Sequence, residues 1–206
     1  MKKFAYLFFT FAFAFLISAC SSEEKIENEF AFAEYKMGDE ILLKSVNGGE
    51  KTLVRTQNGF VVKGEEENKI LMFDFFGTFC TPCQEEATHL TSLWQKNTDN
   101  FIIIGLSHFE NVSDQTVKDF AIKYGAYYFL SNSKENDRIV AQALKDINYQ
   151  SMEQLPFKVV LKDGVYQDLT DFWNKDSKSY VKYYLGKVST EIMQEDINRI
   201  LNGSKK

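Results

Sequence analysis

Proline and histidine each occur only twice in this chain of 206 residues, and cysteine occurs three times. The chain has 44% hydrophobic and 15% aromatic residues, and together with so little proline this is the composition of a folded protein and not of a disordered tail. This composition is typical of one folded domain with additional segments. A structural zinc site needs about four ligands, so the scarcity of histidine and cysteine disfavours one. We expect neither a metal nor a cofactor.

Positive charge is also scarce. The formal net charge is -5, and removing residues 1–19, which contain Lys2 and Lys3 but no acid, leaves -7. Nucleic-acid binding needs clustered lysine and arginine to contact phosphates, so the sequence excludes nucleic acid as a partner.

A hydrophobic run long enough to cross a membrane is missing as well. The apolar run from Phe4 to Ile17 has about fourteen residues, whereas a stable transmembrane helix needs roughly twenty. The run follows a positive start and ends in the small residues Ser18 and Ala19, which is the layout of a signal peptide. An uncleaved anchor helix is the alternative, disfavoured by the short run and the polar residues after it.

The first cysteine ends this segment. Ile17-Ser18-Ala19-Cys20 resembles a bacterial lipobox, which implies that Cys20 becomes the lipidated first residue of the mature protein. Such a cysteine takes no part in redox chemistry. We therefore expect a lipoprotein signal peptide over 1–19, a tether over 20–34 and a folded domain over 35–206. The resemblance implies attachment to a membrane of the cell envelope, inner or outer, facing the periplasm.

The folded region begins with short strand patterns. Asn47-Gly48-Gly49 and Asn58-Gly59 are hairpin turn signals, and they separate three short apolar runs. A β meander is therefore expected over Ile41–Val46, Lys51–Arg55 and Phe60–Lys63.

Strand and helix patterns alternate after the meander. Ile70–Phe76 is a continuous apolar run with one acid, typical of a strand buried on both faces. Further strands are expected at Phe101–Leu106 and Phe157–Leu161, and helices at Pro82–Lys96, at Val117–Tyr124, at Val140–Ile147 and after Ser189. This order predicts an α/β fold with a central mixed sheet flanked by helices.

The other two cysteines, Cys80 and Cys83, follow the buried strand directly and open a helix. The free N–H groups and partial positive charge of a helix start favour a thiolate at Cys80. Cys80 would attack a substrate disulfide, and Cys83, one helical turn away, would resolve the mixed disulfide. The alternatives are a structural disulfide, which would close a very short loop and stabilise little, and half of a metal site.

Asp74 lies inside the buried strand. A carboxylate that loses its hydration there should have a raised pKa, which suits proton exchange with Cys83. A strand acid that reaches water or a backbone partner is an equally good interpretation.

The segment Phe76–Glu86 resembles the redox motif of the thioredoxin superfamily, particularly its membrane-tethered TlpA and ResA type. The family usually has tryptophan where Phe79 stands. Asp74 matches the buried carboxylate of thioredoxin, and Glu86 matches an acid of the TlpA-like group. The resemblance implies that both are catalytic, although Glu86 could also be a solvated first-turn acid that interacts with the helix dipole.

Leu155-Pro156 resembles the cis-proline loop of the same family, with a trans proline at a strand start as the alternative. The resemblance places substrate contacts on five residues around the cysteines, namely Phe79, Thr81, Pro82, Leu155 and Pro156.

The family implies a thiol-disulfide oxidoreductase that acts on disulfides of exported proteins. Proline as the second intervening residue resembles the reducing members of the family, which implies a reductase with electrons from a membrane thiol reductase of the DsbD or CcdA type. The haem-attachment cysteines of cytochrome c precursors are a plausible client. A thiol oxidant or disulfide isomerase is the alternative; a copper carrier would need a histidine close to the cysteine pair.

Overall fold

The computed structural model describes residues 32–64, 68–174 and 179–203. The expected signal peptide, Cys20 and the tether up to residue 31 lie outside this part of the chain. Residues near the start of the described part already contact the folded domain, because the Ala33 carbonyl oxygen accepts a hydrogen bond from Arg138 Nε at 2.6 Å. No helix within the described ranges is both long and apolar enough to cross a membrane.

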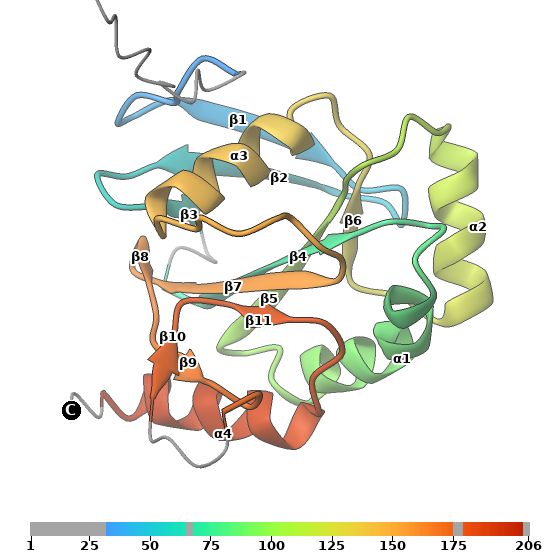
Figure 1. The fold of residues 1–206 in the computed structure, drawn as a ribbon. Coiled ribbons are helices and arrows are strands. Elements are labelled where there is room, and N and C mark those ends of the chain that lie inside the picture. Colours follow the sequence, from blue (N-terminus) through green and yellow to red (C-terminus); the bar gives the residue numbers. More distant parts are fainter. Residues whose placement is uncertain (1–31, 65–67, 175–178, 204–206) are drawn as a thin grey trace, which may run out of the picture.

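The described residues form strands and helices in a mixed order (Figure 1). The strands are β1 (Glu40–Lys44), β2 (Glu50–Arg55), β3 (Phe60–Val62), β4 (Ile70–Phe76), β5 (Phe101–Ser107), β6 (Phe129–Ser131), β7 (Phe157–Lys162), β8 (Val165–Tyr166), β9 (Leu169–Thr170), β10 (Tyr180–Val181) and β11 (Tyr184–Leu185). The helices are α1 (Thr81–Lys96), α2 (Asp114–Tyr124), α3 (Asn136–Asp146) and α4 (Thr190–Leu201).

A mixed sheet forms the centre of the molecule. Its strand order is β11-β7-β4-β5-β6, and β8 pairs with the far end of β7. β4 pairs in parallel with β5 and antiparallel with β7, so it is an interior strand, and all seven of its residues are buried. β1, β2 and β3 form a separate antiparallel sheet, which is the predicted meander.

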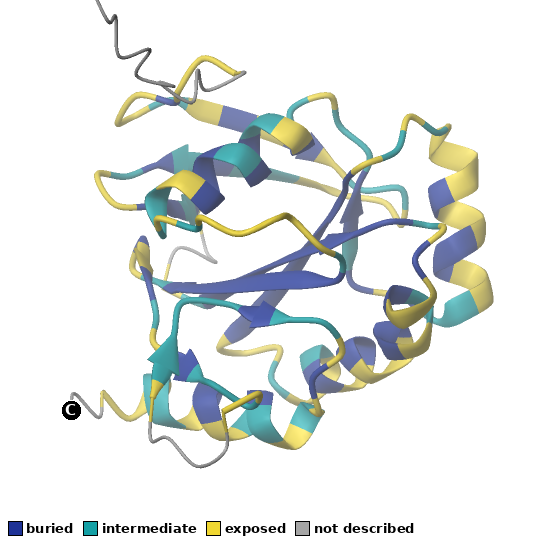
Figure 2. Cartoon of the chain, in the orientation of Figure 1, coloured by how far each residue is buried: buried dark blue, intermediate teal, exposed yellow. Residues whose placement is uncertain are grey.

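Layers on both faces of the central sheet create two hydrophobic cores (Figures 1 and 2). Helices α1, α2 and α4 cover one face, whereas α3 and the β1–β3 sheet cover the other. Side chains alternate along a strand, and in β4 Met72 and Phe76 join the α1 core while Phe73 and Phe75 join the α3 core. Even-numbered positions of β4 therefore face α1.

Sequence pattern predicted the long elements correctly. The four helices, the meander and strands β4, β5 and β7 all occur at the expected places, within a few residues at each end. The expected α/β fold with a central mixed sheet and an N-terminal meander is confirmed. The prediction omitted β6 and β9 to β11, because strands of two or three residues are too short to establish a period.

Candidate active site at the Cys80–Cys83 pair

The cysteine pair lies where β4 ends and α1 begins. Cys80 is the N-cap residue of α1, and its Sγ accepts a hydrogen bond from the Cys83 backbone N–H at 3.3 Å. The two cysteines form a disulfide with 5.2 Å between their Cα atoms. Only 7% of Cys80 and 3% of Cys83 is exposed, whereas Thr81 and Pro82 between them are exposed. Both cysteines are therefore covered, and the segment between them meets solvent at Thr81 and Pro82.

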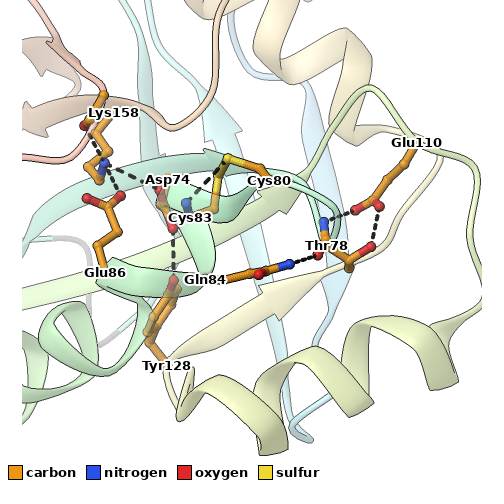
Figure 3. Close-up of a disulfide and its surroundings, with 10 residues drawn as sticks. Asp74, Thr78, Cys80, Cys83, Gln84, Glu86, Glu110, Tyr128 and Lys158 are labelled. Atoms are coloured by element: carbon orange, nitrogen blue, oxygen red, sulfur yellow. Dashed lines mark hydrogen bonds and ion pairs between the residues drawn. A yellow bond between two sulfur atoms is a disulfide. The ribbon is translucent and has the colours of Figure 1, made fainter.

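The loop before Cys80 is held by two side chains from other parts of the chain (Figure 3). Glu110 accepts hydrogen bonds from the Thr78 backbone N–H at 2.9 Å and from the Thr78 hydroxyl at 2.5 Å. Gln84 Nε2 donates to the Thr78 carbonyl oxygen at 2.7 Å. The backbone immediately before Cys80 is thus fixed from both sides.

Phe79 stands on this loop with 61% of its surface exposed. Its ring lies against Gly77, where a Cβ atom would come within 2.7 Å of the ring. The absence of a side chain at Gly77 therefore leaves the space in which the ring rests.

Asp74 lies on the face of β4 that α1 covers, because it has the same parity as Met72 and Phe76. It is 2% exposed, and its Oδ2 accepts a hydrogen bond from the Tyr128 hydroxyl at 2.8 Å. Burial raises the pKa of Asp74, although Lys158 and the Tyr128 hydrogen bond oppose the shift. The expected direction of the pKa shift is confirmed, and the alternative of an acid that reaches water is wrong.

Glu86 is also buried, with only 2% of its surface exposed. The interpretation of Glu86 as a solvated first-turn acid is therefore wrong. Residues three apart on a helix share a face, so Glu86 lies on the same buried side of α1 as Cys83. Burial raises the pKa of Glu86 to about 7 against the opposing effect of Lys158, with which it forms an ion pair.

Lys158 is a residue of the site that the sequence interpretation missed. It is 0% exposed in β7, where it is directly paired with Asp74, and its Nζ lies 4.0 Å from Asp74 Oδ1. The sequence did contain a signal for it, because Lys158 is the single lysine inside the apolar run Phe157–Leu161, just as Asp74 is the single acid inside β4. Tyr128 and Glu110 were also missed, because their contacts come from distant parts of the chain.

The loop before β7 contains the second proline. The Leu155–Pro156 peptide bond is cis, as predicted, and the Pro156 carbonyl oxygen accepts a hydrogen bond from the Gly186 N–H at 2.8 Å. His108, at the end of β5, connects this loop to α3: its Nε2 is 2.9 Å from Glu153 and its Nδ1 is 2.6 Å from Asp137. Within the described ranges, no cluster of His, Cys, Asp and Glu is arranged to hold a metal ion.

Comparison with known protein families shows which family this chain belongs to. The sequence profile of the family described as Thioredoxin matches residues 50–153, half of the chain, and includes both cysteines. The chain belongs to the thioredoxin family. No curated protein sequence matches this thioredoxin family member.

Solved structures are similar to this family member at low sequence identity. The solution structure of a candidate protein disulfide isomerase from Bacteroides thetaiotaomicron has a TM-score of 0.52 and 17% identity, over 84% of this chain and 90% of that one. The thioredoxin domain of a thiol-disulfide oxidoreductase from Bacteroides vulgatus has a TM-score of 0.49 and 13% identity, over 84% and 100%. StoA from Bacillus subtilis has a TM-score of 0.48 and 16% identity, over 77% and 96%. The first likeness supports the thioredoxin fold.

The thioredoxin family and the disulfide together define the chemistry. A Cys-X-X-Cys pair at a helix start, in this fold, makes the protein a thiol-disulfide oxidoreductase. The first cysteine caps the helix, the second lies on its buried side, and two carboxylates and a lysine lie beneath the same side. This arrangement can exchange a disulfide and exchange a proton at the same place.

Proposed function

We propose that this thioredoxin family member reduces disulfides in exported proteins and is held at a membrane by lipid on Cys20. The observation that carries the reducing direction is the charge around the disulfide. Two buried carboxylates, Asp74 and Glu86, share one buried cation, Lys158, on the Cys83 side of α1.

The direction of exchange depends on how well the protein stabilises a thiolate. A strongly oxidising couple stabilises its thiolate, which makes its reduced form favourable. Here Thr81 and Pro82 add no charge, and Cys80 Sγ accepts one backbone hydrogen bond, from Cys83. An excess of carboxylate beside the pair disfavours further negative charge through like-charge repulsion. These features support a couple at the reducing end of the family's range.

A reductase must regain its electrons after each cycle. A membrane thiol reductase of the DsbD or CcdA type would supply them by exchange with the Cys80–Cys83 disulfide. Client disulfides would belong to exported proteins, and the haem-attachment cysteines of cytochrome c precursors are the client class that we favour. Lipid on Cys20 would keep the domain near such a membrane donor, with residues 20–34 as the tether.

The decisive experiment is the equilibrium potential of the couple in the full-length protein. The oxidised fraction is measured by thiol alkylation after equilibration in glutathione buffers, with the double variant Cys80→Ser, Cys83→Ser as the blank. We expect a value near that of thioredoxin, about -270 mV, rather than the roughly -120 mV of DsbA. A value above about -180 mV would assign the protein to the oxidants or isomerases instead.

The anchor is tested separately. Wild type should remain with membranes after a high-salt wash, because acyl chains hold by burial of hydrocarbon rather than by charge. Cys20→Ala should be released into the soluble fraction or remain an unprocessed precursor. Absence of radiolabelled fatty acid from the wild-type protein would contradict lipidation.

A further inference from the structure

His108 stands where three parts of the site meet. β4 ends beside the end of β5, with Phe76 paired to Ser107, and β7 begins beside the same end of β4 (Figure 1). His108 follows Ser107 directly, and its backbone N–H donates to the Phe76 carbonyl oxygen at 2.9 Å. This backbone bond fixes the histidine to the strand that leads into the redox motif.

The His108 ring is held between two carboxylates. Its Nδ1 lies 2.6 Å from Asp137 in α3, and its Nε2 lies 2.9 Å from Glu153 in the loop before β7. A neutral imidazole carries one N–H and presents a lone pair at its other nitrogen, whereas a charged imidazolium donates from both nitrogens. Both hydrogen bonds therefore exist together only while the ring carries its second proton. Without that proton, one carboxylate faces a lone pair and is repelled.

Of the two contacts, the one to Glu153 is the one that can open. Asp137 lies in the first turn of α3, a helix anchored in the core by side chains such as Val140, which is 1% exposed. Glu153 belongs to the segment 147–156, which forms neither helix nor strand and is exposed over 151–154. Segments with little buried apolar surface open at a lower free energy than core helices do. Loss of the proton should therefore release the loop and leave α3 in place.

Phe109 is held by the same histidine. Its ring stacks on that of His108 with 4.0 Å between the centroids, and 53% of the residue is exposed. Its φ of 62° lies in the left-handed region, which a bulky residue rarely adopts without contacts that fix it. A charged imidazolium is attracted to the face of an aromatic ring. The proton on His108 thus holds Phe109 in its exposed position as well as the loop.

Three loops bring exposed apolar side chains to this edge of the sheet. Phe79 stands between β4 and α1, Phe109 follows β5, and Met152, which is 81% exposed, precedes β7. His108 contacts Phe109 directly and reaches the loop of Met152 through a hydrogen bond. A client chain that lies across this edge would meet these side chains next to its disulfide.

We propose that His108 is a positioning residue for protein clients: with the proton on its ring it fastens the loop before Pro156 to α3 and holds Phe109 exposed, and loss of that proton releases both and weakens client binding. The clients that fit are extended chains with apolar side chains beside the disulfide. This inference rests on the proposed action on protein disulfides, and it adds the residue that sets client affinity against pH. The exchange of electrons between the cysteine pair and the client disulfide is unchanged.

The charges around His108 determine the pH at which the loop is released. Burial lowers the pKa of His108, but its hydrogen bonds to Glu153 and Asp137 outweigh this effect and raise the pKa above the ordinary value of about 6.5. The other titratable or charged groups around these two carboxylates are Tyr149 on the loop, Glu110 after β5 and Lys134 before α3. Burial raises the pKa of Tyr149 above 10, so its hydroxyl stays neutral. Client binding should therefore be strongest at acid pH and weaken as pH rises through the pKa of folded His108.

The test uses two substrates with the same leaving group. One is a short capped peptide, apolar on both sides of a cysteine that carries thionitrobenzoate, and the other is N-acetylcysteine amide that carries the same group. The Cys80 thiolate of the reduced full-length protein bonds to the substrate cysteine sulfur and expels thionitrobenzoate as a coloured thiolate. Because both substrates share the nucleophile and the leaving group, the ratio of their rate constants cancels the pH dependence of Cys80. The ratio of peptide to amide therefore reports contacts with the peptide chain.

In wild type this ratio should be highest at acid pH and should fall at least about threefold as His108 loses its proton, because a hydrogen bond to a charged ring holds a loop by a factor of about ten or more. Nuclear magnetic resonance of isotope-labelled histidine gives the pKa of His108 directly. The chain has two histidines, so His89→Gln leaves a single signal to follow. The inflection of the ratio should coincide with the titration of that signal.

Two substitutions should fix the ratio at opposite ends of its range. His108→Gln has an uncharged side chain that cannot donate toward both carboxylates from opposite ends, so the ratio should stay at the low, alkaline value of wild type. Glu153→Gln gives the loop an amide that can donate to the lone pair of a neutral ring, so the ratio should stay at the high, acid value. Asp137→Asn should behave like Glu153→Gln for the same reason. A merely structural histidine would not produce these opposite pH profiles.

Matched controls make the same chemical changes elsewhere. His89→Gln and Glu195→Gln alter exposed residues on α1 and α4. Both should keep the wild-type ratio and its inflection. Glu153→Gln retains His108, so the proposal stays falsifiable even if His108→Gln does not fold.

Two results would overturn the proposal alone. A wild-type ratio that does not change with pH would show that the ring does not control the client surface. An inflection that persists in Glu153→Gln would show that the loop does not respond to the proton on His108. Equal rate constants for peptide and amide at every pH would instead refute recognition of a client chain, and with it the proposed action on protein disulfides.

Discussion

Glu110 binds Thr78 with both of its carboxylate oxygens, one at the backbone N–H and one at the hydroxyl. Oε1 also accepts a hydrogen bond from the Ser107 hydroxyl at 3.0 Å. The end of β5 is thereby connected to the loop that precedes Cys80. A residue two positions before Cys80 is thus held by an acid that lies outside the redox motif.

We expect Glu110→Ala to loosen this loop and to lower the free energy of unfolding by about 1–3 kcal/mol, because it leaves the Thr78 N–H without its acceptor. Urea denaturation of the oxidised protein measures the loss, and amide hydrogen exchange at residues 77–79 localises it. Asp119→Ala, which removes an exposed acid bonded to Gln115 one turn away, is the matched control. Equal losses in both variants would show that the Thr78 contact has no special effect.

The two cysteines should differ in reactivity after reduction. Cys80 caps α1 and receives the Cys83 N–H, so its thiol pKa should lie below the ordinary value of about 8.5. Alkylation at limiting reagent, followed by peptide mass spectrometry, should modify Cys80 first. Cys83→Ser should trap mixed disulfides with partner proteins, and Cys80→Ser should not. Equal alkylation of both cysteines would contradict the helix-start argument.

The fold and the cysteine pair could be predicted from the sequence, but the residues that surround the pair could not. Cys80 and Cys83 follow a buried strand, and this local context predicted the helix and the position of Cys80 at its start. Asp74 was visible as one acid in an apolar run, yet its partner could not be named, because the β4–β7 register joins residues 84 positions apart. The alternative interpretation of Glu86, as a solvated first-turn acid, was wrong, because helix periodicity alone does not say which face of α1 the sheet covers.

His108 should make stability depend on pH. Burial lowers its pKa, but hydrogen bonds to Glu153 and Asp137 outweigh this effect and raise the pKa above the ordinary value of about 6.5. A folded-state pKa that is raised gives stability that is fully present below about pH 6.5 and is lost as pH rises through the folded pKa. The difference in unfolding free energy between wild type and His108→Gln should therefore be larger near pH 5.5 than near pH 8.5.

The matched control is His89→Gln, since His89 is exposed on α1. Thermal or urea unfolding of the oxidised proteins at both pH values gives the comparison. A difference for His108→Gln that does not change with pH would mean that its bonds to Glu153 and Asp137 do not favour the charged ring.

Phe79 should affect exchange with protein clients more than exchange with small disulfides. Phe79 is 61% exposed next to Cys80 and its ring rests on Gly77, so it offers apolar surface where a client chain would lie under the proposed function. Burial of part of that ring against a client contributes about 25 cal/mol per Å². Phe79→Ala should therefore lower kcat/KM for reduction of insulin by roughly threefold to thirtyfold, which corresponds to about 25–80 Å² of lost apolar contact.

Small disulfides provide the internal reference for this prediction. The disulfide of thionitrobenzoate is too small to react at Cys80 and cover the Phe79 ring at the same time. Its rate of reduction by Phe79→Ala should therefore remain within about twofold of that by wild type. Phe79→Trp, which keeps an aromatic ring beside Gly77, should retain most of the insulin activity. A loss that is equal for both substrates would show that Phe79 acts on the reactivity of Cys80. A loss confined to insulin would assign the ring to client binding, because only the protein client has side chains to place against it.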